Sequence, residues 1–316
     1  MNLKRIGVFF VILSVSLLGF GGCSEDEKIC GGEVVFDGGD TGAVRFMTFN
    51  IRVDVIIDFG NRWSSRREMV YDTFRVNGPD VAGLQESLSH QVDDIQRALP
   101  EYSHYSAGRN DGGRSGESCA IFYRKDRFSL IDRGTFWFSD TPFKPGSKDW
   151  GNWPPRICSW VHLRDNQAGG SFYVYNVHLD HLSQNSRRKS VRLLAEKISE
   201  RGTDDPFVIM GDFNMKLDNP AMEYLTSLGY VDAWQSVNPG VRNSGTRHGF
   251  GGGRSGPKID HIPMCRSARA LSAKIDHYNV KGRYPSDHFA VIAEVLFEEP
   301  KPSLSAEKAV GEAGKS

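Results

Sequence analysis

Polar residues able to carry chemistry stand at the ends of several short apolar runs. The set consists of carboxylates, amides and histidines: Glu86, Asp212, Asp260, Asp287, Asn50, Asn214, His178 and His288. Carboxylates and imidazoles commonly move protons in catalysis, and carboxylate and amide oxygens suit a hard divalent cation such as Mg²⁺. Each residue alone is more simply a turn former, a helix cap or a solvated charge. Their repetition favours one shared site, provided that the strand ends converge.

The runs that precede these residues predict alternating strands and helices within a single domain, residues 43–297. Segments rich in Val, Ile, Phe and Tyr predict the strands Val44–Ile51, Val81–Gln85, Ser118–Tyr123, Phe128–Phe136, Ser159–Leu163, Phe172–His178, Phe207–Gly211, Lys258–Pro263 and Phe289–Phe297. Helices are predicted over Ser64–Val76, His90–Leu99, Ser186–Arg201 and Ala221–Leu228. No internal repeat or clear linker divides this stretch.

Two segments without periodicity, Ser139–Pro155 and Gly240–Pro257, are expected to border the site. Long ordered loops are uncommon unless they serve a function, although surface decoration is the alternative. Four tryptophans lie in or beside the first segment: Trp137, Trp150, Trp153 and Trp160. They either cover a small apolar or ring-bearing leaving group, a lipid or a sugar, or only pin the loop, and we favour pinning.

In chain order, the motifs around the polar residues are TFN, LQE, NVHLDH, GDFN, IDH and SDH. This ordered set resembles the endonuclease/exonuclease/phosphatase (deoxyribonuclease-I-like) superfamily over about residues 44–297. The resemblance implies an α/β (α+β) fold, a four-layer sandwich of two packed mixed β-sheets flanked by helices. Residues 108–112, 155–158 and 178–181 further resemble a bacterial subgroup of metal-dependent hydrolases whose substrate is poorly defined.

The resemblance implies hydrolysis of a phosphomonoester or phosphodiester by metal-assisted attack of water, with Mg²⁺ or Mn²⁺ as the cofactor. Glu86 is the best single metal ligand, and Asn50 and Asp287 would help to hold the ion, directly or through water. The hard oxygen donors and the absence of a thiolate cluster from the sequence disfavour zinc.

The same resemblance implies roles for the catalytic residues. Asp212 would act as the general base on the attacking water, and Asn214 would orient the water or the phosphate oxygens. His288 would contact the scissile phosphate, whereas His178 would stabilise the pentacovalent phosphorane or assist the leaving group. Asp260 would orient one of these two histidines, and the sequence leaves open which one.

Arg109 and Arg156 are candidate substrate-binding residues, because a guanidinium can bridge two phosphate oxygens. A structural salt bridge to Asp111 or Glu117 is an equally good interpretation. His181 adjoins the histidine motif, and we expect it to lie outside the first layer of pocket residues rather than in it.

Residues 1–23 predict a lipoprotein signal peptide. Lys4 and Arg5 precede an uncharged run that is too short to span a bilayer comfortably, and small residues lead to Cys23, the expected lipidation site. A plain secretory signal is the alternative. We therefore expect an extracytoplasmic protein, lipid-anchored to a bacterial membrane on its periplasmic side or at the cell surface. Residues 24–42 would form a flexible tether and residues 298–316 a disordered tail.

The composition limits the classes of function. The 316 residues carry 39 Lys+Arg and 39 Asp+Glu, and 25% of them are charged. These values exclude a mostly disordered chain or a multi-span membrane protein and argue against bulk electrostatic capture of nucleic acid. Three functions compete: a phosphoesterase for a small or lipid-linked ester, an extracytoplasmic nuclease, and a non-catalytic binding lipoprotein. The complete set of polar residues disfavours the third, and no protein partner is inferred.

Overall fold

The computed structural model of this protein describes residues 42–242 and 244–298. The predicted signal peptide with Cys23, the tether and the tail lie outside the described residues, apart from Gly42 and Glu298 at their borders. Among the described residues, no helix has the length and apolar character needed to cross a membrane.

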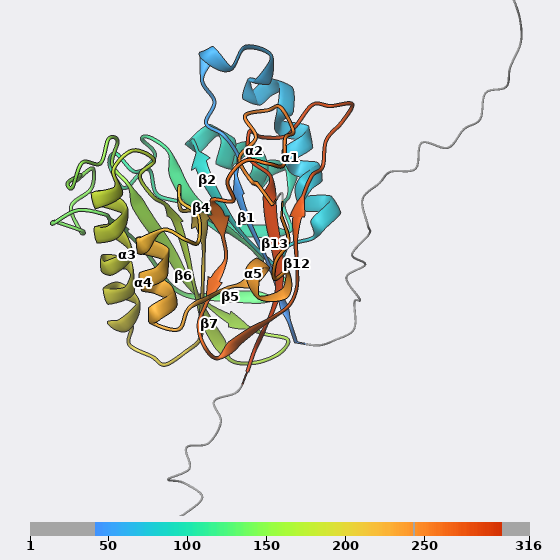
Figure 1. Cartoon of the computed structure of the whole chain (residues 1–316). Coiled ribbons are helices and arrows are strands. Elements are labelled where there is room, and N and C mark those ends of the chain that lie inside the picture. The colour runs from blue at the N-terminus through green and yellow to red at the C-terminus, as the bar shows by residue number, and fades with distance from the viewer. Residues whose placement is uncertain (1–41, 243, 299–316) are drawn as a thin grey trace, which may run out of the picture. The chain divides into compact units, whose positions relative to one another are not determined.

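Two β-sheets form the centre of the fold (Figure 1). In spatial order, the first sheet consists of β12 (Ala268–Asp276), β13 (Ala290–Phe297), β1 (Val44–Asn50), β2 (Val81–Ser87), β4 (Ser118–Arg124) and β3 (Tyr102–Tyr105). The second consists of β5 (Phe128–Trp137), β6 (Ile157–Asp165), β7 (Ser171–His178), β8 (Phe207–Asp212), β11 (Pro263–Met264) and β9 (Val231–Asp232), with β10 (Asp260–His261) paired to β8. Both sheets are mixed, because β1–β2 and β7–β8 are parallel pairs and their other neighbours are antiparallel.

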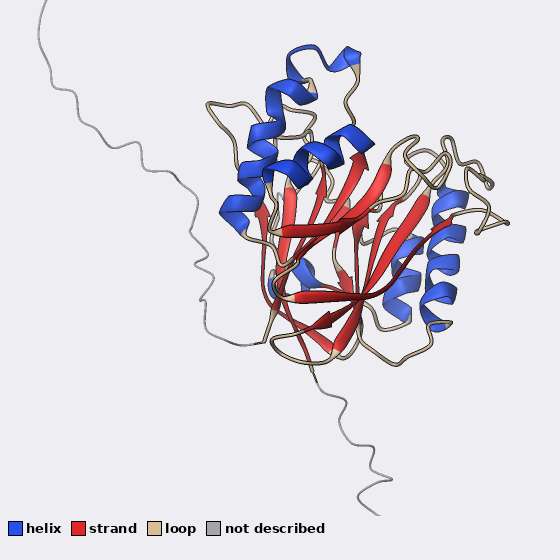
Figure 2. Ribbon diagram, turned by 180° about the vertical axis from the view of Figure 1, so that it is seen from behind, coloured by secondary structure: helices blue, strands red, loops and turns tan. Residues whose placement is uncertain are grey.

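Helices cover the outer faces of the two sheets (Figure 2). The covering helices are α1 (Trp63–Asn77) and α2 (Ser89–Ala98) on the first sheet and α3 (Gln184–Ser199) and α4 (Pro220–Ser227) on the second. The short helix α5 (Ala233–Val237) packs against β12 and β13, and the 3₁₀ helix η1 (Ile56–Asn61) precedes α1. On the first sheet, Phe74 of α1 packs edge-on against Tyr102 and Phe122. On the second sheet, α3 and α4 pack against β7 and β8 in one apolar cluster.

The main core lies between the sheets and draws buried side chains from both, among them Phe46, Val81, Val174 and Val208. Inward-facing residues of two mixed sheets therefore meet in one apolar layer. Helix, sheet, sheet and helix follow one another as layers, which confirms the predicted four-layer α/β sandwich.

The sequence pattern predicts most of these elements but misses β3, β9, β12, η1 and α5. Four of them are short, and the fifth, β12, is an edge strand in which Ala, Arg, Ser and Lys outnumber β-branched residues. The predicted strand Lys258–Pro263 is wrong as one element. It is divided into β10 and β11, which pair separately with β8.

Candidate active site

The topology brings four strand ends to one rim of the sandwich. Asn50 ends β1, Glu86 lies near the end of β2, His178 ends β7, and Asp212 ends β8. Each sheet contributes one parallel pair, and β1 contacts β8 while β2 contacts β7 across the interface between the sheets. The four side chains therefore meet where the carboxyl ends of the two parallel pairs face each other.

The remaining predicted residues reach the same rim from later segments. Asp260 of β10 stands opposite Asp212 in the antiparallel pairing of β10 with β8. Asp287 and His288 come just before β13, separated from it by Phe289. Because β13 runs antiparallel to β1, the start of β13 lies beside the end of β1. Residues separated by more than 200 positions in the sequence are thus placed together by strand pairing.

A buried arginine joins two segments of this rim, the end of β1 and the loop before β13. Arg66 of α1 is 1% exposed and donates to the carbonyl oxygens of Ile51 and Pro285, the latter at 3.0 Å. The Ser286 hydroxyl also donates to Asn50 O at 2.6 Å. These bonds hold the loop that carries the SDH motif against the end of β1.

At the rim, several residues other than glycine have backbone conformations that such residues seldom adopt. Arg52, Glu86 and Asn214 have φ values of 59°, 61° and 53°, a left-handed region that costs energy for residues other than glycine. At Gly211, a Cβ atom would lie 2.3 Å from Val177 O, so the GDFN motif requires its glycine for this close approach. Strain of this kind gathers at functional sites.

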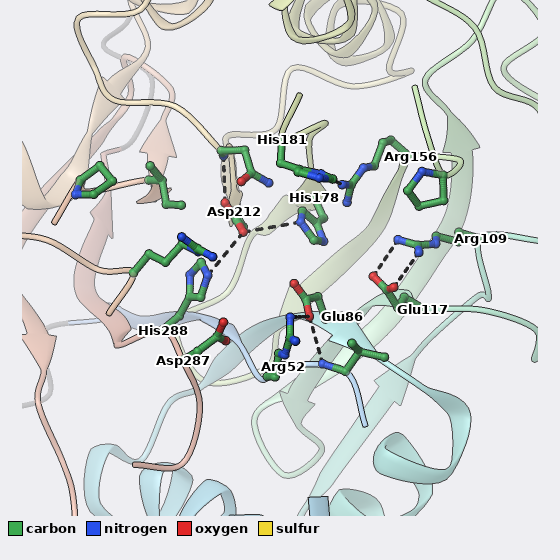
Figure 3. Close-up of a pocket in the computed structure, with 16 residues that line it drawn as sticks. Arg52, Glu86, Arg109, Glu117, Arg156, His178, His181, Asp212, Asp287 and His288 are labelled. Carbon is green, nitrogen blue, oxygen red and sulfur yellow. Dashed lines mark hydrogen bonds and ion pairs between the residues drawn. The ribbon is translucent and has the colours of Figure 1, made fainter. Parts of the chain in front are cut away.

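A cavity of about 540 Å³ opens at the rim (Figure 3). The predicted residues that line it are Glu86, Arg109, Arg156, His178, Asp212, Asn214, Asp287 and His288. Asn50 and Asp260 are fully buried behind the lining, where Asn50 donates to Asp212 and Asp260 forms a hydrogen bond with His288. The structure therefore brings together all the site residues predicted within its described part.

Asp260 is the partner of His288, which answers the question that the sequence leaves open. His288 Nδ1 lies 2.9 Å from Asp260 Oδ2, and Nε2 lies 4.0 Å from Asp212 Oδ2. Burial would lower the pKa of His288, but the charge and hydrogen bond of Asp260, with the charge of Asp212, raise it to about 10. His288 is therefore held as an imidazolium at neutral pH.

Asp212 is the most perturbed carboxylate of the cavity. Burial and the nearby charge of Asp260 raise the pKa of Asp212 to about 7, against the opposing effect of His288. Its Oδ1 accepts from Asn214 N at 2.8 Å, and its Oδ2 accepts from Asn50 Nδ2 at 3.1 Å. A carboxylate whose pKa lies near neutrality is suited to accept a proton during a reaction.

His178 lies on the other side of Asp212, with its Nε2 at 3.5 Å from Asp212 Oδ2. Burial, followed by the charges of Arg156 and Arg109, holds the pKa of His178 well below its ordinary value. The two histidines beside Asp212 thus differ in charge at neutral pH, because only His288 has a buried carboxylate on its Nδ1 side.

Glu86 and Asp287 give the cavity a pair of hard oxygen donors. Burial opposes ionisation of Glu86, but hydrogen bonds from Val53 N at 3.0 Å and Asn50 Nδ2 at 3.1 Å hold its pKa below the ordinary value. Asn50 presents its amide nitrogen to Glu86 and its oxygen to Arg52 N. It therefore positions the carboxylate, and it would reach a metal directly only after its amide turned.

A second group of ligand atoms also lies close enough together to hold an ion. Side-chain atoms of Asp212, Asp260 and His288 fall within 4.8 Å of one another. However, Asp260 is fully buried and binds His288 Nδ1, which makes this group suited to handling protons. The carboxylates of Glu86 and Asp287, which both face the cavity, fit a hard cation better.

Arg109 and Arg156 line the cavity, and both also form structural contacts. Arg109 makes a two-bond pair with Glu117, at 2.7 and 2.6 Å. Arg156 donates from Nη2 to His181 Nδ1 at 2.9 Å. The salt bridge to Glu117 is thus present without removing the arginine from the cavity. His181 lines the cavity as well, contrary to our expectation.

Sequence reasoning gave no role to two other cavity residues, Arg52 and Arg247. Arg52 follows the TFN motif by two positions and binds Asp58 through two bonds at 2.9 Å. Arg247 stands in the segment Gly240–Pro257, which borders the cavity as predicted, and its backbone bridges to His288. The sequence offered one signal for Arg52, its proximity to the TFN motif. It offered none for Arg247, which reaches the cavity through the bridge between its segment and His288.

Comparisons with known proteins find relatives of similar sequence and fold. The chain resembles a solved mannosyl-6-phosphatase of Bacteroides thetaiotaomicron, with 32% identity, a TM-score of 0.75 and coverage of 80% of this chain and 100% of that one. A solved endonuclease/exonuclease/phosphatase of Bacteroides vulgatus gives 33% identity, a TM-score of 0.76 and coverage of 81% and 99%. An uncharacterized protein of Acanthamoeba polyphaga mimivirus is 27% identical, over 75% of this chain and 92% of its own length.

A family model extends these pairwise likenesses. The model of the Endonuclease/Exonuclease/phosphatase family matches residues 47–288, which include every polar residue gathered at the rim from Asn50 to His288. With its two packed mixed sheets and its motifs in order around one cavity, the chain belongs to the endonuclease/exonuclease/phosphatase family of hydrolases.

Proposed function

We propose that this protein is an exported, Mg²⁺-dependent phosphoesterase that hydrolyses a phosphomonoester by attack of water. The observation that carries the proposal is the position of Asp212, between an imidazolium and a neutral histidine in a cavity that also contains Glu86 and Asp287. This arrangement combines a base near neutral pKa, a cationic donor and hard oxygen ligands.

In the proposed reaction, Asp212 accepts the proton of the attacking water. Asn214 assists, because its backbone N–H fixes Asp212 Oδ1 and its side-chain amide is held by Leu179 O at 3.0 Å. His288, oriented by Asp260, donates to a phosphate oxygen, and His178 donates toward the leaving group. Mg²⁺ bound by Glu86 and Asp287, with the help of Asn50, would offset the negative charge of the phosphate.

The charge of the cavity favours a small ester over a nucleic acid. Its lining contains the four arginines Arg52, Arg109, Arg156 and Arg247 and the imidazolium of His288, against four carboxylates from Glu86, Glu117, Asp212 and Asp287, a surplus of only one cation. The lining contains no Phe, Tyr or Trp on which a base could stack. A groove that tracks a nucleic-acid strand combines a surplus of basic residues with such rings. The similarity to a mannosyl-6-phosphatase also supports a monoester.

The test is a panel of phosphoesters incubated with residues 24–316 in Mg²⁺, in Mn²⁺ and in EDTA. We expect release of inorganic phosphate from monoesters with either metal and none in EDTA. Asp212→Asn should lower kcat by about 10²–10⁴-fold, the usual contribution of a general base, with little change in the thermal midpoint.

Two other outcomes would contradict this proposal. Nicking of plasmid DNA without phosphate release from any monoester would identify a nuclease. Absence of turnover on the whole panel, with Glu86→Gln indistinguishable from wild type, would identify a binding protein on the same fold.

A further inference from the structure

One end of the cavity is formed by Arg109, Glu117, Arg156 and His181, which we call the polar wall. Figure 3 shows the polar wall away from Asp287 and His288, with His178 and Glu86 between the two groups. A phosphate held near Asp212 and His178 therefore has the polar wall next to it, where the rest of the substrate would lie.

The polar wall is fixed before any substrate arrives. Arg109 and Glu117 both lie in the connection between β3 and β4, and Arg109 N donates to Glu117 O at 2.9 Å. Trp137 Nε1 donates to Arg109 O at 2.6 Å. The side chains of Arg109 and Glu117 keep 14% and 17% exposure, so their ion pair can still be reached from the cavity. A preorganised pair loses little conformational freedom on binding.

The charges of the polar wall are matched. Glu117 neutralises Arg109 through two hydrogen bonds, and the fully buried Asp180 lies 3.6 Å from Arg156 Nε. A second phosphate or a carboxylate on the substrate would need an unmatched cation here and would meet the Glu117 carboxylate instead. Matched charges therefore favour a neutral group.

The polar wall offers donors and acceptors side by side. Arg109 and Arg156 can only donate, and the carboxylate of Glu117 can only accept. Because a guanidinium donates to His181 Nδ1, the neutral form of His181 carries its proton on Nε2. A hydroxyl both donates and accepts, so adjacent hydroxyls match this alternation. An alkyl or aromatic group would leave the remaining hydrogen-bonding positions without partners, among them Arg109 Nε and Arg156 Nε.

We propose that the polar wall is a subsite for a neutral, polyhydroxylated leaving group, which makes the substrate a phosphate monoester of a sugar. This inference rests on the proposed function and names its substrate class. The oxygen of water forms a new bond to phosphorus as the bond between phosphorus and the sugar oxygen breaks. The proton released by the water ends on the sugar oxygen, so the products are inorganic phosphate and the free sugar.

The test compares mannose 6-phosphate with n-hexyl phosphate, which has the same number of carbons and no hydroxyls, using residues 24–316 in Mg²⁺. We expect kcat/KM for the sugar ester to exceed that for the alkyl ester by about 100-fold or more, because a site built to hydrogen-bond a substrate rejects an analogue without those groups.

Variants of the polar wall should separate recognition from catalysis. Glu117→Gln should lower kcat/KM for mannose 6-phosphate by about 10-fold or more, the worth of a hydrogen bond to a charged group, and leave n-hexyl phosphate within about 3-fold. The variant should also gain on a sugar 1,6-bisphosphate relative to the 6-phosphate, since Arg109 then lacks its carboxylate. Arg109→Lys, which keeps the charge but not the two-bond geometry, should show the same selective loss on the sugar ester.

Arg114→Gln is the matched control, because Arg114 belongs to the same connection but pairs with Asp93 at the surface with 70% exposure. It should leave both esters unchanged. Equal kcat/KM for the two esters in wild type, or equal losses on both in Glu117→Gln and Arg109→Lys, would overturn the subsite while leaving the phosphoesterase intact. Failure of wild type to release phosphate from any ester would overturn both proposals together.

Discussion

The contact between Asp260 and His288 is the single pair on which the proposed chemistry depends most. Asp260→Asn removes the charge that holds His288 as an imidazolium while keeping a similar shape. We expect kcat for a phosphomonoester to fall by about 10²–10⁴-fold, with KM within about 3-fold, because the imidazole loses its charge and its orientation. Steady-state phosphate release measures both constants.

A second carboxylate–histidine pair in the chain supplies the control. Asp205 Oδ2 lies 2.7 Å from His162 Nε2, in a contact remote from the cavity lining. Asp205→Asn should leave kcat unchanged. If Asp260→Asn retained wild-type kcat, His288 would need no orientation and its assigned role would be wrong.

The polar residues of the rim could be predicted from the sequence because their types limit what they can do in any fold. Their partners could not. That Asp260 faces His288 rather than His178 depends on the pairing of β10 with β8 and on the loop before β13. Likewise, the sequence offered phosphate binding and a salt bridge to Glu117 as alternatives for Arg109, and the structure gives one arginine that makes the salt bridge and still lines the cavity.

At the scale of elements, a buried lysine joins β10, the short strand that carries Asp260, to the end of β9. Lys258 Nζ is 2.9 Å from both Asp260 O and His261 Nδ1, and 3.4 Å from the carboxylate of Asp232 at the end of β9. Lys258→Met leaves Asp232 buried without its cation. We expect a loss of about 3–5 kcal/mol in the free energy of unfolding at pH 7, measured by urea denaturation. The double variant with Asp232→Asn should recover part of it.

The pH dependence of the free energy of unfolding gives an independent check on the pair of Lys258 and Asp232. Burial opposes ionisation of Asp232, but Lys258 and His261 hold its pKa far below the ordinary value. A carboxyl whose pKa is lower in the folded state contributes stability above its unfolded pKa, about 4, and loses that contribution as the pH falls toward the folded pKa. The difference in the free energy of unfolding between wild type and Asp232→Asn should therefore become smaller below about pH 4. A constant difference down to pH 2 would contradict the assignment.

Elements with strong periodicity were predictable, and those fixed by their neighbours were not. The apolar face of α3, formed by Val191, Leu194 and Ile198, is visible in the sequence and buried in the structure. By contrast, β12 becomes a strand because it pairs along the whole of β13. The strand predicted over Lys258–Pro263 is interrupted where β10 ends and β11 begins, a division decided by pairing with β8.

For the whole molecule, the sequence predicts export and a lipid anchor at Cys23. Expressed in a bacterium with labelled palmitate, the wild-type chain should incorporate the label and sediment with membranes, whereas Cys23→Ser should do neither. The kcat/KM of the Cys23→Ser protein should equal that of residues 24–316, because Cys23 lies outside the matched family segment 47–288. A wild-type chain without label would leave only the secretory alternative.

The antiparallel pairing of β1 with β13 has a practical consequence for handling the protein. Val44 stands opposite Val295. The start of β1 and the end of β13 therefore lie together at one end of the first sheet's strands (Figure 1). The cavity lies at the opposite end of these strands, roughly 20 Å away, which is the length of the seven extended residues of β1. Coupling to a bead or a sensor surface through a residue beside Val44 or Phe297 should thus leave the entrance facing bulk solution, and an immobilised sample should turn over substrate as freely as a dissolved one.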